Sequence, residues 1–206
     1  MRTQPALFDG PVVVCAGLEE DGPRALALSW ARTTYRHFAL RRVPGLTAWL
    51  PSLFVAVVQP SADGRVLVGR TAPSTAVPGR WQLPGGSVEP PDGDGPLDER
   101  GLRENAAREL AEETGVDLAP DALRLWLVTH GARGHTGVLY RAPALPPDLL
   151  RGRRAALVCA ETAAGREPEF DRLALVRAPH ELAALGDTRV DYLEPVVHRC
   201  AAASGS

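Results

Sequence analysis

Residues 83–118 read LPGGSVEPPDGDGPLDERGLRENAARELAEETGVDL, and they carry the most informative pattern of the sequence. It opens on a glycine turn at residues 84–86 and later places Glu109, Glu112 and Glu113 at spacings of three and one. On a helix of about 3.6 residues per turn, these three carboxylates gather on one side. Like charges so close together destabilise an isolated helix. The stretch therefore predicts an acidic helix face that needs a cation or basic partners.

The other face of the same segment is apolar. Leu102, Ala106 and Leu110 recur at helical spacing, which is typical of a helix packed against a sheet. Gly115 follows the last carboxylates, and glycine readily takes the left-handed conformation that ends many helices. Upstream, residues 81–83 (WQL) form a short strand-like run before the glycine turn. The predicted order is strand, glycine turn, acidic helix, glycine stop.

At these residues the chain resembles the Nudix hydrolase family, whose signature reads G-x5-E-x7-R-E-U-x-E-E-x-G-U with U aliphatic. RELAEETGV at residues 108–116 satisfies every fixed position of the second half, and PGGSVE supplies the lead-in. The distance from Gly86 to Arg108 exceeds the signature's spacing by eight residues. The excess falls in PPDGDGPLDERG, which is typical of a surface-loop insertion.

The insertion leaves the signature's first glutamate without a clear counterpart. Asp92 holds that place when the count runs forward from the glycine turn, and Arg100 holds it when the count runs back from the helix. Glu99 and Glu104 are nearby substitutes. All four positions stay open.

The resemblance implies an α/β fold, a Nudix α/β/α sandwich with a mixed sheet. We expect residues 51–206 to form the Nudix domain and residues 1–50 to form an N-terminal extension, a strand plus an amphipathic helix over Gly22–Arg42 that packs on it. This extension could be a core cover, a substrate-side flap or a dimerisation arm. The other expected strands are 52–59, 65–70, 123–129, 136–141 and 169–176, and the other expected helices are 146–164, 180–185 and 190–203.

Composition narrows the class of protein. The chain has 206 residues and a formal net charge of −2, which argues against a nucleic-acid binder that relies on a basic field. Its three cysteines form no metal-ligand pattern and fit a reducing cytoplasm. No apolar run reaches the roughly 20 residues of a membrane span. We therefore expect a cytoplasmic protein without a membrane or nucleic-acid partner, and the resemblance leaves a homodimer open.

Grouped carboxylates suit Mg²⁺, with Mn²⁺ as a substitute, because both ions prefer hard oxygen ligands. The resemblance implies that Glu109, Glu112 and Glu113 bind the metal, with a backbone oxygen of Gly85 or Gly86 completing the shell. Arg108 is then expected to hold the acidic cluster by a salt bridge. For the general base, Glu112 is the first candidate. Glu169, in front of the late strand, is the second, with an exposed acid at a strand end as the competing interpretation.

Four further residues are candidates for substrate contact, beside the Gly85-Gly86 turn. Arg70 and Arg80 could bind phosphate, although arginines at strand ends also simply reach into water. Trp81 could stack on a base, although an aromatic residue beside a strand is more often core. Arg133 lies in one turn with His130 and His135, and such turns are common places for substrate contacts.

These expectations predict an enzyme that cleaves the pyrophosphate bond of a nucleoside diphosphate joined to another group, such as a nucleotide sugar. Its products would be a nucleoside monophosphate and a phosphorylated second product. One alternative is a nucleoside triphosphate pyrophosphohydrolase, which would release inorganic pyrophosphate. The other is a non-catalytic sensor that binds a nucleotide on the same fold. Retention of all three helix glutamates counts against the sensor.

Overall fold

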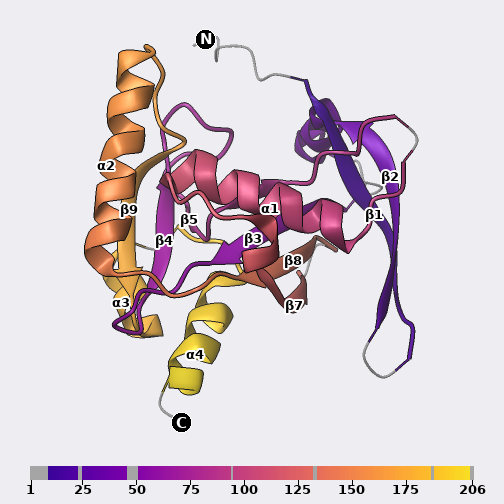
Figure 1. Ribbon diagram of the computed structural model, residues 1–206. Helices are drawn as coiled ribbons and strands as arrows, with labels where there is room; N and C mark the ends of the chain where they lie inside the picture. The colour runs from indigo at the N-terminus through magenta and orange to yellow at the C-terminus, as the bar shows by residue number, and fades with distance from the viewer. Residues whose placement is uncertain are drawn as a thin grey trace.

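A computed structural model describes residues 9–22, 25–45, 51–93, 95–131, 134–186 and 188–204. Figure 1 shows its helices and strands. The strands are β1 (Pro11–Glu20), β2 (Leu26–Thr34), β3 (Leu53–Val58), β4 (Val66–Thr71), β5 (Trp81–Gln82), β6 (Gly85–Ser87), β7 (Arg124–His130), β8 (Thr136–Arg141) and β9 (Phe170–Val176). The helices are α1 (Glu99–Thr114), α2 (Pro147–Ala163), α3 (Pro179–Ala184) and α4 (Leu193–Ser204), with short 3-10 turns at Tyr35–Arg42 and Pro120–Ala122.

Two sheets form the centre of the domain. The first has the order β6-β3-β8-β7, in which β3 pairs with β8 in parallel and the other neighbours are antiparallel. The second has the order β5-β4-β9 and is antiparallel. The predicted α/β arrangement with a mixed sheet is therefore confirmed. A turn after β3 leads into β4. The isolated bridge Pro60–Val66 joins the ends of this connection, but β3 and β4 belong to different sheets.

Strand β3 lies at the centre because both of its faces are apolar. Leu53, Val55 and Val57 belong to the core beneath α1, whereas Ala56 and Val58 belong to the core formed with β4, β9, α3 and α4. A run that is apolar at every position is typical of a strand buried on both sides. The acidic helix α1 therefore packs on one face of the mixed sheet, as Figure 1 shows.

Helix α1 begins and ends at residues that stabilise helix termini. The Asp98 side chain accepts a hydrogen bond from the Gly101 backbone N–H at 2.9 Å, which caps the first turn. Gly115 ends the helix with φ of 77°, and a Cβ there would lie 2.5 Å from the Arg153 carbonyl oxygen. The predicted glycine stop is confirmed, and it also lets α2 approach α1 closely.

The helix predicted over Gly22–Arg42 is wrong. Residues 26–34 form β2, which pairs antiparallel with β1 in a two-stranded hairpin, and only the 3-10 turn after β2 is helical. The cause is an alternating pattern in Leu26, Leu28 and Trp30, whose spacing of four between the first and last also fits a helix. Gly22, with φ of 83°, supplies the turn between the two strands.

The start of β1 and the end of β2 cover the core. The half of the hairpin that ends at the turn between the two strands projects away from the domain (Figure 1). Val13 and Cys15 are buried in the core beneath α1, and the Val13 N–H donates to the Val88 carbonyl at 2.8 Å. Arg32 on β2 donates to the carbonyls of Pro91 and Gly93, so it holds the loop inserted before α1. The division at residue 50 stays a prediction, because residues 46–50 lie outside the described residues.

Candidate active site

The acidic residues of α1 meet a fourth carboxylate from a distant part of the chain. Glu109, Glu112 and Glu113 lie along one side of α1, and Glu169 immediately precedes β9. The charge of Glu169 acts on both Glu109 and Glu113, and the charge of Glu112 acts on Glu169. We call these four residues the acidic cluster. Glu113 is 1% exposed, whereas Glu112 faces solvent.

The glycine turn lies directly against this cluster. The Gly85 backbone N–H donates to Glu113 Oε2 at 2.6 Å. A Cβ on Gly86 would lie 2.5 Å from Glu109 Oε2, and a Cβ on Gly85, whose φ is 154°, would lie 2.2 Å from the Val55 carbonyl oxygen. Both positions therefore need glycine, the first to admit the carboxylate and the second to admit the backbone of β3.

Burial and mutual repulsion disfavour ionisation within the cluster. Burial, and then the charge of Glu169, raises the pKa of Glu109 to about 7. The same two causes raise the pKa of Glu113 well above its ordinary value. Glu169 is exposed, as the competing interpretation of this residue expected, but partial desolvation of its carboxyl group and the charge of Glu112 still raise its pKa. A positive charge beside these carboxylates would stabilise their ionised form.

The cluster fits a divalent cation by the chemistry of its donors. Glu113 Oε1 is buried and has no hydrogen-bond partner among the described residues, and an orphaned buried oxygen of this kind is costly without a ligand. The side-chain atoms that could bind a metal in this cluster are all carboxylate oxygens, which suit Mg²⁺ or Mn²⁺. Within the described part of the chain, no group of three or more acidic, histidine or cysteine side chains is already arranged to hold a metal ion. The cluster is thus a set of neighbouring ligands that a cation would draw together.

The raised pKa of Glu109 predicts how the metal-free protein responds to pH. In EDTA we expect the free energy of unfolding to fall as the pH rises from about 4.5 through about 7. In that window Glu109 keeps its proton in the folded protein but loses it in the unfolded chain. Urea unfolding at several pH values measures this, and Glu109→Gln should weaken the dependence. Stability that rises across the same window would contradict the assignment.

Arg108 does not simply neutralise the cluster. Its Nη1 donates to Glu89 at 2.7 Å, its Nη2 donates to Asn105 Oδ1 at 3.1 Å, and Glu109 Oε1 lies farther away at 3.8 Å. The Asn105 side chain also accepts from the Glu89 N–H at 2.9 Å. The predicted salt bridge from Arg108 to the cluster thus exists as a longer contact, while Glu89 is its main partner.

Glu89 is the residue that the sequence interpretation missed. Its charge acts on Glu109. It is the last residue of the PGGSVE segment, which the sequence analysis had matched to the family signature. The candidates for the signature's first glutamate lie elsewhere: Arg100 pairs with Glu104, Glu99 pairs with Arg103, and Asp92 is exposed.

The two candidate phosphate-binding arginines differ in their surroundings. Arg70 forms a bidentate ion pair with Asp171, at 2.8 and 2.6 Å, beside the start of β9. Arg80 donates to Gln82 Oε1 at 3.0 Å, while its buried Nε has no partner in the described structure. Arg80 therefore retains an unsatisfied donor, whereas Arg70 would have to leave its partner to bind phosphate.

The remaining candidates are less well placed. Trp81 is 2% exposed, and its indole N–H donates to the Leu185 carbonyl at 3.0 Å. This core position argues against stacking on a base. Arg133 lies outside the described residues. His130 and His135, which flank it, reach the rim of a hollow on the other face of the mixed sheet.

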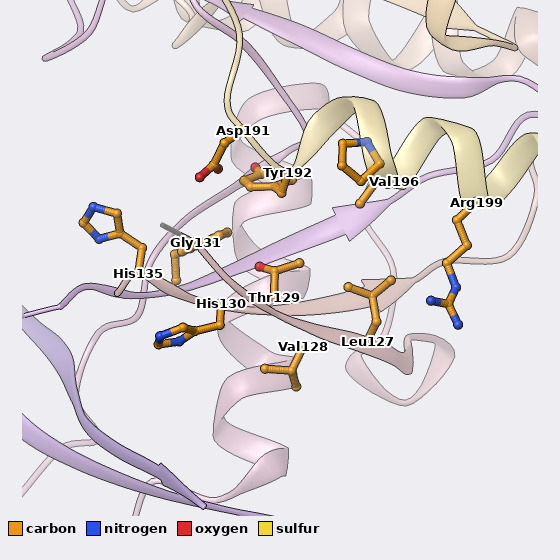
Figure 2. A pocket seen from close by; sticks show the side chains of 12 residues that line it. Leu127, Val128, Thr129, His130, Gly131, His135, Asp191, Tyr192, Val196 and Arg199 are labelled. Carbon is orange, nitrogen blue, oxygen red and sulfur yellow. The ribbon is translucent and has the colours of Figure 1, made fainter. Parts of the chain in front are cut away.

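This hollow has a volume of about 450 Å³ and lies between β7, the loop after it and α4, as Figure 2 shows. Phe54 and Tyr192 stack within it, with ring centroids 5.3 Å apart and planes at 24°. Gly137 makes room, because a Cβ there would lie 2.3 Å from the Phe54 ring. Burial raises the pKa of Tyr192, and the charges of Arg80 and Glu113 also act on its phenol. Tyr192 lines the hollow, whereas none of the four acids of the cluster does.

Comparison with known proteins supports the fold. The family model described as NUDIX domain matches residues 51–183. No curated protein matches the sequence. Two similar solved structures are DR0079 from Deinococcus radiodurans (20% identity, TM-score 0.50, covering 92% of this chain and 98% of that chain) and a MutT protein from Methanosarcina mazei Go1 (19%, 0.50, 76% and 97%). At these identities the structural likeness shows the fold alone. Among the described helices, none combines the length and apolar character that a membrane span requires.

Proposed function

The chain belongs to the NUDIX family of pyrophosphohydrolases, and from that premise we propose that it cleaves the diphosphate of a nucleoside diphosphate joined to a second group, such as a sugar. The observation that carries this proposal is the buried, unpartnered Oε1 of Glu113, next to Glu109 and against the glycine turn. A diphosphate bond is attacked by water only when its oxygens are neutralised. In this proposal the acidic cluster binds the cations that neutralise these oxygens.

In this proposal Glu109, Glu112 and Glu113 hold Mg²⁺ or Mn²⁺, with the Gly85 carbonyl as a further oxygen ligand. An ion held there would supply positive charge to phosphate oxygens and would lower the pKa of a water. Glu112, which is exposed on the same side of α1, accepts the proton as water attacks phosphorus and the bond to the bridging oxygen breaks. Glu169, which is exposed, is the second candidate for this role, because its charge acts on Glu109 and Glu113.

Arg80 is the better of the two candidate phosphate ligands. Its Nε–H is buried without a partner among the described residues, and a phosphate oxygen would satisfy it by a charge-assisted hydrogen bond. Its charge acts on the Tyr192 phenol, on which the charge of Glu113 also acts. Arg70 stays a weaker candidate because of its ion pair with Asp171.

We further propose that the hollow takes the base or sugar at one end of the substrate. Its size falls within the range of small-molecule pockets, roughly 300–1,000 Å³. Its stacked aromatic pair suits a planar or ring-shaped group. Thr129→Trp should fill the hollow and raise KM about tenfold or more, with kcat little changed. Steady-state kinetics measures this, with the exposed Leu125→Trp on the same strand as control. An unchanged KM would place that end of the substrate elsewhere.

The proposed reaction is tested by a panel of nucleotide sugars, other nucleoside diphosphate derivatives and nucleoside triphosphates, incubated with Mg²⁺ and analysed by mass spectrometry. We expect a nucleoside monophosphate and a phosphorylated second product. Release of inorganic pyrophosphate from triphosphates alone would favour the triphosphate pyrophosphohydrolase. Binding of nucleotides without any turnover would favour the sensor.

A further inference from the structure

We propose that Arg154, on α2, is a positioning residue that ties the end of α1 to the start of β9 and so holds the two segments that carry the acidic cluster together before a cation binds. The proposal rests on the proposed function, since it concerns the same cluster. Within the described structure, the hydrogen bonds of Arg154 go to backbone carbonyls and to no carboxylate of the cluster, so it acts through the backbone of the segments that carry these acids.

The contacts of Arg154 bridge two distant segments. Its Nη1 donates to the carbonyl oxygen of Glu113 at 3.3 Å, and its Nη2 donates to the carbonyl oxygen of Phe170. Glu113 is the buried acid of α1, and Phe170 directly follows Glu169. One guanidinium group therefore fixes the backbone beside two acids whose charges repel each other.

Repulsion within the cluster makes such a brace necessary. Without a cation, the carboxylates on α1 and at Glu169 repel one another whenever they are ionised, and this repulsion favours separation of helix and strand. The carbonyl end of α1 adds a partial negative charge, and its last turn carries no basic residue of its own. Arg154 supplies the missing positive charge from the neighbouring helix, at the point where the two segments meet.

The position of α2 fixes where this guanidinium lies. Gly115 allows the end of α1 to approach α2 so closely that a Cβ would lie 2.5 Å from the Arg153 carbonyl oxygen. Arg154 is half-buried at this contact, whereas the neighbouring Arg153 is exposed. The planar fork of arginine presents donors in two directions at once, which the single ammonium of lysine does not reproduce.

The experiment measures Mn²⁺ affinity by the EPR signal of the free ion, in the full chain stripped of metal. We expect Arg154→Met to weaken Mn²⁺ binding about 10–100-fold, the range found when groups that orient metal ligands are lost. Arg153→Met, one residue away on the same helix, should stay within about twofold of the parent. Arg154→Lys should fall between them, because lysine keeps the charge but not the two-way hydrogen bonding.

A second readout separates positioning from a general structural role. If Arg154 only gathers the ligands, high Mn²⁺ should restore the kcat of Arg154→Met, since mass action compensates for weak binding. A variant with a lower melting temperature but an unchanged Mn²⁺ affinity would overturn the proposal. So would a loss of kcat that saturating Mn²⁺ leaves uncorrected.

The outcomes also separate this proposal from the proposed function. A parent protein that binds Mn²⁺ but hydrolyses nothing on the panel, with Arg154→Met binding less, would overturn the function and support the brace. A parent that hydrolyses its substrate, with Arg154→Met binding Mn²⁺ equally well, would support the function and overturn the brace. A parent that binds no Mn²⁺ would overturn both.

Discussion

Glu112→Gln is expected to lower kcat by about 10²–10⁴-fold, the range for loss of a group that transfers a proton in the reaction. Glutamine keeps the shape of the side chain and one oxygen but neither accepts the proton nor carries the charge that a cation needs. Because Glu112 faces solvent, the melting temperature should stay within a few degrees of the parent's. Steady-state kinetics and thermal unfolding at saturating Mg²⁺ measure the two effects.

Two further substitutions control this result. Glu167→Gln, an exposed residue two positions before Glu169, should leave kcat unchanged. Glu169→Gln should lower kcat less than Glu112→Gln if Glu112 is the base. A larger loss in Glu169→Gln would transfer that role to Glu169, and full activity in Glu112→Gln would contradict the role given to α1.

Gly86→Ala is expected to lower kcat about 10–100-fold without unfolding the protein. The added Cβ would lie 2.5 Å from Glu109 Oε2 and 2.7 Å from Glu109 Cδ, so the carboxylate must move away from its place in the acidic cluster. The clash involves only the end of a flexible side chain, and losing the orientation of a metal ligand typically costs that much. Mn²⁺ affinity and kcat should fall together.

Gly85→Ala provides the contrast. There the Cβ would lie 2.2 Å from the Val55 carbonyl oxygen and 2.6 Å from the Ala56 Cα, and the backbone has φ of 154°. Clashes with backbone are relieved only by moving β3, so this variant should lose stability or fail to fold. Equal melting temperatures for the two variants would contradict this account of the glycine turn.

The sequence predicted the acidic helix well because its signals are local. Gly115 ends α1 with the expected left-handed conformation, and the apolar stripe of Leu102, Ala106 and Leu110 is buried against the mixed sheet. Strand 136–141 matches its predicted bounds. In each case the residues that decide the structure lie within a few positions of one another.

The N-terminal hairpin was missed because its structure depends on a partner strand. The positions Leu26 and Trp30 fit both a strand and a helix, and pairing with β1 decides between them. A local signal was nevertheless present: Asp21-Gly22, between two apolar stretches, is a typical hairpin turn. Its Asp21 N–H donates to the Ala25 carbonyl at 2.9 Å.

The residues that surround the three acids of α1 could not be predicted from the sequence, because the fold brings them together from distant segments. Glu109, Glu112 and Glu113 could be named from spacing alone, since one helix carries them. The approach of Glu169, the pairing of Glu89 with Arg108 and the brace by Arg154 join segments far apart in the chain. Nothing in the local sequence of α2 marks Arg154 among its neighbouring arginines.

The most direct test of the central claim is a Mn²⁺ titration of the metal-free protein, followed by EPR, with Glu113→Gln and Glu109→Gln alongside. We expect the parent to bind Mn²⁺ and both substitutions to weaken binding at least about tenfold, because each removes a charged oxygen ligand. If the parent bound no Mn²⁺, or if both variants bound it as tightly as the parent, the acidic cluster would not be a metal site and the proposed reaction would have no support from this structure.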